Sequence, residues 1–348
     1  MKKLFLSVFA IAALASCMQD ETLGAAQREN IVFENAFVDN TTKAIDPSIT
    51  TTGENAISTF QVWGTTQGDH TNAAIVPIFA NETVEKDDNG VWGYADNKTQ
   101  YWIDGNVYNF SAVVNGTATL GVNGLPATIN YVASSGKDLL FATYGPYEAE
   151  ENNNPKVDFT FAHLLSKAVF TFENTTPEGN VNSPANIYEV TNIQISGLDA
   201  NADYDVTANA WTNNTSGDFT LNFGDIVAAD ANSVVSAAPI AEGESGKSTY
   251  EHLLIPGTHN VTITCKITLY NGYVDESRIV DVINYNKTLD ITFQKGVAYN
   301  LNLKAGLKQA IEFKVTAVES WNDPYVETNV PEQGHDNTPD QNINNGNN

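Results

Sequence analysis

Alternation of apolar and polar residues with a period of two runs through most of this sequence, and it restricts the fold more than any other feature. The alternation is clear in the segments VTITCKITLY (261–270), AYNLNL (298–303) and IEFKVTAV (311–318). This period turns every second side chain to the same face of a strand, and Thr, Val, Ile and aromatic residues, which favour strands, fill these segments. Gly and Asn turn signals separate them, as in hairpins. The sequence therefore predicts an all-β fold of many short antiparallel strands packed as β-sandwiches.

The length of the chain and one polar segment predict two domains. A chain of 348 residues is long for one domain. The segment YGPYEAEENNNPK (144–156) is rich in Pro, Asn and Glu and poor in apolar residues. We therefore expect an N-terminal β-sandwich domain over residues 29–150 and a C-terminal one over residues 156–322. Residues 323–348 are polar and rich in Asn, which predicts a disordered tail.

The first residues have the pattern of an export signal. Two lysines precede the apolar run LFLSVFAIAALA (4–15), which is too short to cross a bilayer and predicts a signal peptide over residues 1–16. The following LASC resembles the lipobox of bacterial lipoproteins, in which the cysteine thiol accepts a diacylglycerol and the freed α-amine accepts an acyl chain. This resemblance implies that Cys17 is lipidated and that residues 17–28 tether the chain to outer-membrane lipid. The alternative is an ordinary secreted protein with a cysteine near the cut.

The charge and the second cysteine narrow the range of partners. A formal net charge of −25 argues against nucleic acid as a partner, because the phosphate backbone would repel the chain. If Cys17 is acylated, Cys265 has no cysteine left to pair with. Cys265 shares one face of its predicted strand with apolar residues. We therefore interpret it as a buried core thiol.

No motif for catalysis or for a cofactor stands out. The sequence contains no G-x-S-x-G elbow, P-loop, dinucleotide fingerprint or EF-hand loop. His252 and His259 lack the H-E-x-x-H context of a zinc site, and His163 lies between apolar neighbours, which favours a partly buried structural histidine. We expect no enzymatic activity, no metal and no cofactor.

An aromatic segment, VWGYADNKTQYWIDGNVYNF (91–110), has two interpretations. Exposed rings such as Trp92 and Trp102 could stack on sugars, which would make the chain a surface lipoprotein that captures glycans for uptake. Alternatively, the segment is a hairpin whose rings fill the core and pair across strands. We favour the second interpretation.

Several segments resemble the fimbrillin-like family, the lipoprotein-derived pilins of type V fimbriae. KDLLFATYGPY (137–147) and NPKVDFTFAHLLSKAVFTFEN (154–174) resemble the family's D-L-L-x-A … V-x-F-x-F-x-H-x-L-S-K-x-x-F signature. STFQVWGTT (58–66), TQYWIDGNVYNFSAVV (99–114) and the closing segment 293–321 resemble other family blocks in the same order. Ile103 replaces the proline that usually follows Tyr-Trp.

The resemblance implies two consecutive transthyretin-like antiparallel β-sandwich domains in a structural or adhesive fimbrial subunit. Its partners would be other fimbrial subunits, joined by strand exchange, and a host or glycan adhesion ligand. It would be lipid-anchored and surface-exposed on the outer membrane, then part of a fimbrium after processing. The polar tail offers few apolar residues for a donor strand, which favours an accessory or tip subunit over a shaft subunit.

In this family a trypsin-like protease activates the subunit by cutting after a basic residue. The segment ENIVFENAFVDN (29–40) has Ile31, Phe33 and Phe37 at alternating positions, which predicts a first strand with these side chains on one face. The candidate cleavage residues are Arg28 and Lys43. A cut after Lys43 would release this strand together with the lipid, whereas a cut after Arg28 would release the lipid alone.

We therefore expect chains shed from the cell surface to begin at Ala44, as measured by mass spectrometry of their N-terminal peptides. Recovering only chains that begin at Cys17 would contradict cleavage after Lys43.

Overall fold

The computed structural model describes residues 29–38 and 57–327, except 71, 96–97, 152, 178–185, 216–218, 229–238, 308 and 321–322. Nearly all regular structure in these ranges is β-strand, and the two helices described there are single 3₁₀ turns at Ala133–Ser135 and Glu276–Arg278. The all-β prediction is confirmed. No helix in the described ranges is long and apolar enough to cross a membrane.

The first half of the chain forms a curved N-terminal sheet of seven strands in the order β1-β9-β8-β5-β2-β3-β4. Neighbouring strands pair antiparallel except β1 and β9, which run parallel. The bounds are β1 Phe33–Val38, β2 Thr59–Gln67, β3 Ile75–Lys86, β4 Trp92–Gly93, β5 Val107–Val114, β8 Leu140–Glu148 and β9 Val157–His163.

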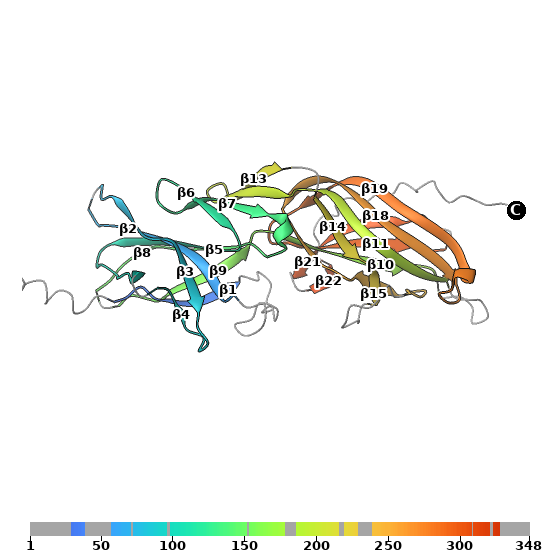
Figure 1. The fold of residues 1–348 in the computed structure, drawn as a ribbon, viewed down its shortest axis with the longest axis horizontal. Coiled ribbons are helices and arrows are strands. Elements are labelled where there is room, and N and C mark those ends of the chain that lie inside the picture. Colours follow the sequence, from blue (N-terminus) through green and yellow to red (C-terminus); the bar gives the residue numbers. More distant parts are fainter. Residues whose placement is uncertain are drawn as a thin grey trace, which may run out of the picture.

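A second sheet, here called the junction sheet, takes strands from both halves of the chain. Its order is β13-β12-β7-β6, and β7 from the first half pairs antiparallel with β12 from the second. Figure 1 shows this sheet over the middle of the molecule. The bounds are β6 Thr117–Leu120, β7 Pro126–Val132, β12 Asn201–Asp205 and β13 Ala210–Thr215.

Two further sheets make up the C-terminal half. One has the order β15-β16-β10-β20-β21-β22, with β17 also paired to β10, and the other has the order β14-β11-β18-β19. The first contains β10 Ser166–Asn174, β15 Ile226–Ala228, β16 Ser245–Ser248, β17 His252–Leu254, β20 Ala298–Ala305, β21 Glu312–Ser320 and β22 Asp323–Glu327. The second contains β11 Asn186–Leu198, β14 Phe219–Gly224, β18 Gly257–Asn271 and β19 Ile279–Phe293.

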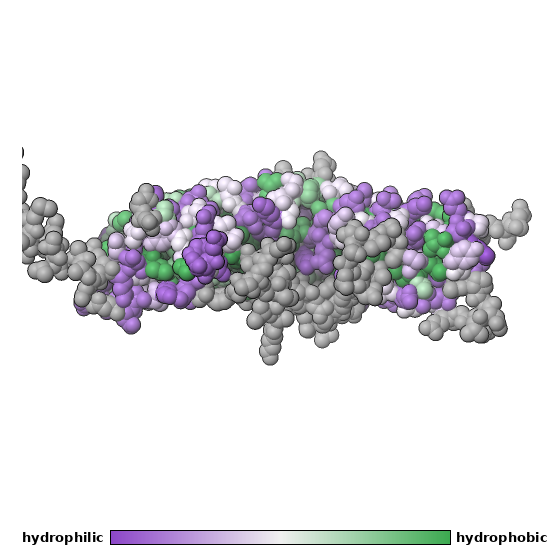
Figure 2. Space-filling model, turned by 60° about the horizontal axis from the view of Figure 1, so that its bottom comes forward, coloured by the Kyte–Doolittle hydropathy of each residue, from purple (hydrophilic) through white to green (hydrophobic). Residues whose placement is uncertain are grey.

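Three apolar clusters lie between these sheets. The N-terminal core lies against one face of the first sheet, and the C-terminal core lies between the two C-terminal sheets. A junction core joins Trp63 and Tyr131 of the first half to Leu164, Leu165 and Ile255 of the second. The molecule is elongated (Figure 1). Figure 2 shows hydrophilic and hydrophobic patches interspersed over the coloured part of one face.

The structure differs from the sequence-based expectation at three places. Strand β9 follows the polar segment 144–156, yet it pairs with β8 and β1 of the N-terminal sheet. Strands β10 and β20 pair in parallel, as β1 and β9 do, although antiparallel pairing was expected throughout. Residues 323–327, expected within the disordered tail, form β22 and pair with β21. The rest of that tail, 328–348, lies outside the described residues.

The interpretation of Cys265 as a core thiol is confirmed. It lies in β18 with Ile263 and Ile267 on the same buried face and is 6% exposed. Burial raises the pKa of its thiol to about 12, because a thiolate in an apolar environment loses its hydration.

Since the native thiol stays protonated at mildly alkaline pH, we expect iodoacetamide to leave Cys265 unmodified in the folded chain and to alkylate it in urea. A Cys17→Ser background makes Cys265 the one cysteine of the chain, and mass spectrometry reads the modification. Rapid alkylation under native conditions would contradict the burial.

Candidate functional site

The first strand is the candidate site, because it lies at an edge and still completes a core. Within the described residues β9 is its one strand partner, paired in parallel from Phe33 opposite Val157 to Val38 opposite Phe161. The register slips by one residue between Phe33 and Ala36. Such a bulge moves the following side chains to the other face. Ile31 and Phe33 before the slip, and Ala36 and Val38 after it, all pack on the N-terminal core.

Phe33 occupies the centre of that core. It is 3% exposed, and its ring lies within contact of five aromatic rings from five separate segments. The ring centroids are 5.6–6.2 Å from that of Phe33, a separation at which aromatic pairs stabilise each other beyond their buried area. These partners are Phe60, Phe79, Tyr94, Phe110 and Phe159.

The residues before β1 are held by backbone hydrogen bonds on both sides. Ile31 N–H donates to the Gln100 carbonyl at 2.9 Å, and Trp102 N–H donates to the Glu29 carbonyl at 3.0 Å. On the other side, Val157 N–H donates to the Val32 carbonyl at 2.8 Å. The chain over residues 29–33 thus lies between β9 and the segment that follows β4.

Polar side chains complete this attachment. The Tyr94 hydroxyl donates to the Ile31 carbonyl at 2.8 Å, and burial raises the pKa of Tyr94, so the donor keeps its proton. The Glu29 carboxylate accepts from both the backbone and the side-chain nitrogen of Asn154, at 2.8 and 2.9 Å. Lys156 forms an ion pair with Glu34, which contributes little because both side chains are about half exposed.

The sequence identified part of this site. Ile31 and Phe33, predicted for the first strand, are buried together in the N-terminal core. The backbone of Phe37 lies in β1 opposite Thr160, while its side chain is outside the described residues, as are Cys17, Arg28 and Lys43. The alternation of residues along the strand did not predict Ala36 and Val38 as core residues, because a bulge interrupts the period of two.

The aromatic segment 91–110 packs inwards. Trp92 and Trp102 are 7% and 3% exposed and belong to the N-terminal core. Tyr108 and Phe110 are also buried, while Tyr101 is 45% exposed. The core-packing interpretation of these rings is confirmed, and the glycan-capture alternative has no support in the two tryptophans on which it depended.

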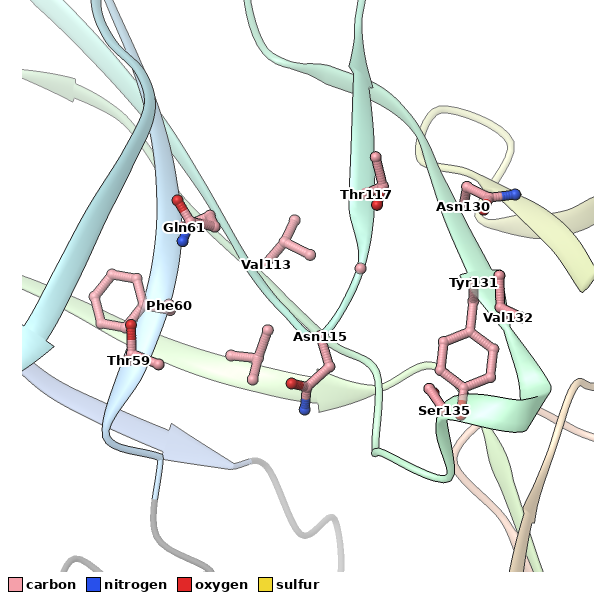
Figure 3. Close-up of a pocket in the computed structure, with 12 residues that line it drawn as sticks. Thr59, Phe60, Gln61, Val113, Asn115, Thr117, Asn130, Tyr131, Val132 and Ser135 are labelled. Atoms are coloured by element: carbon pink, nitrogen blue, oxygen red, sulfur yellow. The ribbon is translucent and has the colours of Figure 1, made fainter.

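A cavity of about 420 Å³ opens between the ends of β2, β5, β6 and β7. Figure 3 shows Thr59, Phe60 and Gln61 on one side of it and Tyr131 and Ser135 on the other. Three of its polar lining groups have partners in the chain: Asn115 Nδ2 donates to the Asp138 carbonyl, Asn130 Nδ2 to the Asp203 carboxylate, and the Tyr131 hydroxyl to the Lys137 carbonyl. Among the described residues, no cluster of His, Cys, Asp and Glu is placed to hold a metal.

The AHLLSK block (162–167) lies where the two halves of the chain meet. His163 is 6% exposed, and its Nδ1 lies 2.5 Å from Asp138 Oδ2. Leu164 and Leu165 belong to the junction core, and the Leu164 carbonyl accepts from Trp211 Nε1 at 2.9 Å. The block therefore joins the halves, and the interpretation of His163 as a structural histidine agrees with this environment.

Comparisons with known proteins give one family and a set of similar structures. The family model described as fimbrillin-like matches residues 42–321. A crystal structure of a fimbrial protein from Bacteroides vulgatus is 17% identical, with a TM-score of 0.59 over 82% of this chain and 99% of that one. A proposed cell adhesion protein from Bacteroides ovatus is 16% identical, with a TM-score of 0.49 over 86% and 99% of the two chains. No curated protein matches the sequence.

We expect Phe33→Ala to lower the free energy of unfolding by about 3–5 kcal/mol, because it leaves a cavity among five rings. Urea titration followed by tryptophan fluorescence measures this, since Trp92 and Trp102 report on the same core. Val32→Ala is the matched control: Val32 is 37% exposed, so its truncation should cost about 0.5 kcal/mol or less. Equal effects of the two substitutions would contradict the central position of Phe33.

Proposed function

Because this chain belongs to the fimbrillin-like family, we propose that it is a structural and adhesive subunit of a cell-surface fimbria, assembled by strand exchange after its first strand is removed. Membership of this family supports a fimbrial or adhesive role, in which the chain itself is a structural protein and not a catalyst. The packing of β1 is the observation that supports strand exchange.

Removal of β1 would leave a strong demand for a replacement strand. The space vacated by Phe33 is lined by five aromatic rings, and β9 would lose its parallel partner. An apolar groove beside an open strand edge favours the addition of a strand from another chain. Because β1 is an edge strand, its removal breaks strand pairing with β9 alone. The hydrogen bonds that Glu29 and Ile31 make with Trp102, Gln100 and Tyr94 are lost with it.

Lipidation and proteolytic cleavage take place at residues near the first strand. Cys17 is acylated and holds the precursor in outer-membrane lipid, and a trypsin-like protease then cuts after Lys43. That cut lies beyond β1 in the sequence, so it releases strand and lipid together. A cut after Arg28, before β1, would remove the lipid and keep the core closed.

An accessory or tip position is favoured over a shaft position. A shaft subunit must donate a strand as well as accept one, and the apolar residues of the C-terminal segment are few and scattered: Tyr325, Val326, Val330 and Ile343. The backbone of β22, which contains Tyr325 and Val326, pairs with β21 of the same chain. A strand that already completes its own sheet has less to gain from pairing with another subunit.

We propose two transthyretin-like domains, as the sequence predicts, but with a boundary later in the chain than the polar segment 144–156. Strand β9 pairs in the N-terminal sheet, whereas β10, which begins at Ser166, pairs in a C-terminal sheet. The buried pair Leu164 and Leu165 connects the two strands. We therefore place the boundary at these leucines, about ten residues beyond the polar segment 144–156.

The experiment compares Lys43→Gln with Arg28→Gln in producing cells. We expect wild-type and Arg28→Gln chains to be found in fimbriae by immunogold electron microscopy, and Lys43→Gln chains to stay on the cell body with the first strand attached. Fimbriae that contain Lys43→Gln at the wild-type level would contradict activation at Lys43. Absence of the wild-type chain from any fimbria would contradict the proposed function itself.

A third variant in the same assay, which lacks residues 323–348, distinguishes a tip subunit from a shaft subunit. A tip subunit should still be found at fimbrial ends after this deletion, whereas a shaft subunit should lose polymerisation. Labelling along the whole length of wild-type fimbriae would contradict the tip position.

A further inference from the structure

The outer edge of β19 is long and open. Strand β19 runs for 15 residues and forms the last strand of its sheet, and in the described part of the chain β18 is its one strand partner. Figure 1 shows the β18–β19 hairpin at the outer margin of the C-terminal half, reaching the end of the molecule. Proteins usually protect such edges with proline, bulges or short strands. β19 contains no proline, and its pairing with β18 shifts register at one end alone.

This edge also exposes apolar side chains. Ile279, Val280 and Val282 are 41%, 57% and 41% exposed, whereas Tyr285, Ile291 and Phe293 further along the strand are buried in the C-terminal core. Burying apolar surface favours association. The edge therefore has both the hydrogen-bonding groups and the apolar surface that pairing with another strand requires.

The charges of β19 point to a second copy of the same chain. β19 holds three charged side chains, Asp281, Lys287 and Asp290, and is close to neutral in a protein of net charge −25. When two copies pair antiparallel with Asn284 opposite Asn284 of the second copy, Asp281 lies opposite Lys287 of the second copy. The dimer then contains two such pairs of opposite charge. Asp290 lies beyond this paired stretch, and its carboxylate accepts from Asn260 Nδ2 at 2.7 Å.

Neighbouring registers lose this match. A shift of the two-fold axis by one residue to either side preserves the two faces of the strand, but it places Asp281 opposite Tyr285 or Leu289 and Lys287 opposite Ile279 or Ile283. A charge without a counter-charge protects an edge strand, whereas a matched pair favours one alignment. The charges of β19 therefore select a single register for self-association.

The apolar residues agree with the same register. With Asn284 on the axis, Ile283 lies opposite Tyr285 of the second copy. Both belong to the face of β19 that carries the buried residues.

We propose that β19 is a self-association edge through which two copies of this chain pair antiparallel about a two-fold axis at Asn284. The two four-stranded sheets then form one continuous sheet of eight strands. This contact is separate from β1, which lies in the N-terminal half, so it joins subunits side by side whether or not they exchange strands.

Charge reversal tests the register directly. In the purified full chain with Cys17→Ser, we expect sedimentation equilibrium to show wild-type dimers. Asp281→Lys and Lys287→Asp should each weaken self-association at least about tenfold, because two attractive pairs become repulsive. An equimolar mixture of these two variants should restore dimers, since each reversed charge then meets its complement, and native mass spectrometry should identify them as heterodimers.

Two controls carry the same changes in net charge at exposed positions of the N-terminal half, Lys137→Asp and Asp88→Lys. Both should dimerise as the wild type does. A wild-type chain that stays monomeric at all concentrations, or a mixture of the two β19 variants that forms no heterodimer, overturns the proposal.

A cysteine test does not depend on the folding of the charge variants. Asn284→Cys should form an intermolecular disulfide on mild oxidation, because this residue faces its own copy across the axis. Asn286→Cys should not, because it faces Val282 of the second copy. Equal crosslinking at both positions, or none at Asn284→Cys, overturns the register.

Discussion

The packing of Phe33 among five aromatic rings is the contact on which the N-terminal half depends. Its partners come from β2, β3, β5, β9 and the segment after β4, so one side chain brings five parts of the chain to a common centre. The strand that carries it is bonded to the sheet through β9 alone. An edge strand thus supplies a central side chain of the core, and the proposed strand exchange depends on this combination.

The junction between the halves has the opposite character. Three kinds of contact hold the halves together. They are the pairing of β7 with β12, the hydrogen bond from Trp211 to Leu164, and a shared apolar core. Such a large apolar interface restricts motion between domains. The residues of β1 belong to the N-terminal core and not to this junction core.

Open edges lie in both halves of the molecule and differ in chemistry. The proposed removal of β1 would open the edge of β9 beside an aromatic core and would favour an apolar strand, whereas the outer edge of β19 has charged residues and exposed aliphatic residues. Long-lived contacts suit the first, because the replacement strand is buried. Side-by-side contacts suit the second, because its charges stay near water and discriminate between registers more than they add affinity.

The sequence by itself determined the class of fold, the burial of Cys265 and the core positions of Ile31 and Phe33, because a period of two reports which side chains share a face. It also identified the fimbrillin-like family from its blocks. Only the tertiary structure decided which strands pair: β9 with β1, β7 with β12, and β10 with β20 in parallel. Period two carries no information on the partner or its direction, since these depend on contacts between distant segments. For the same reason the bulge after Phe33, which places Ala36 and Val38 on the core, became visible in the folded chain alone.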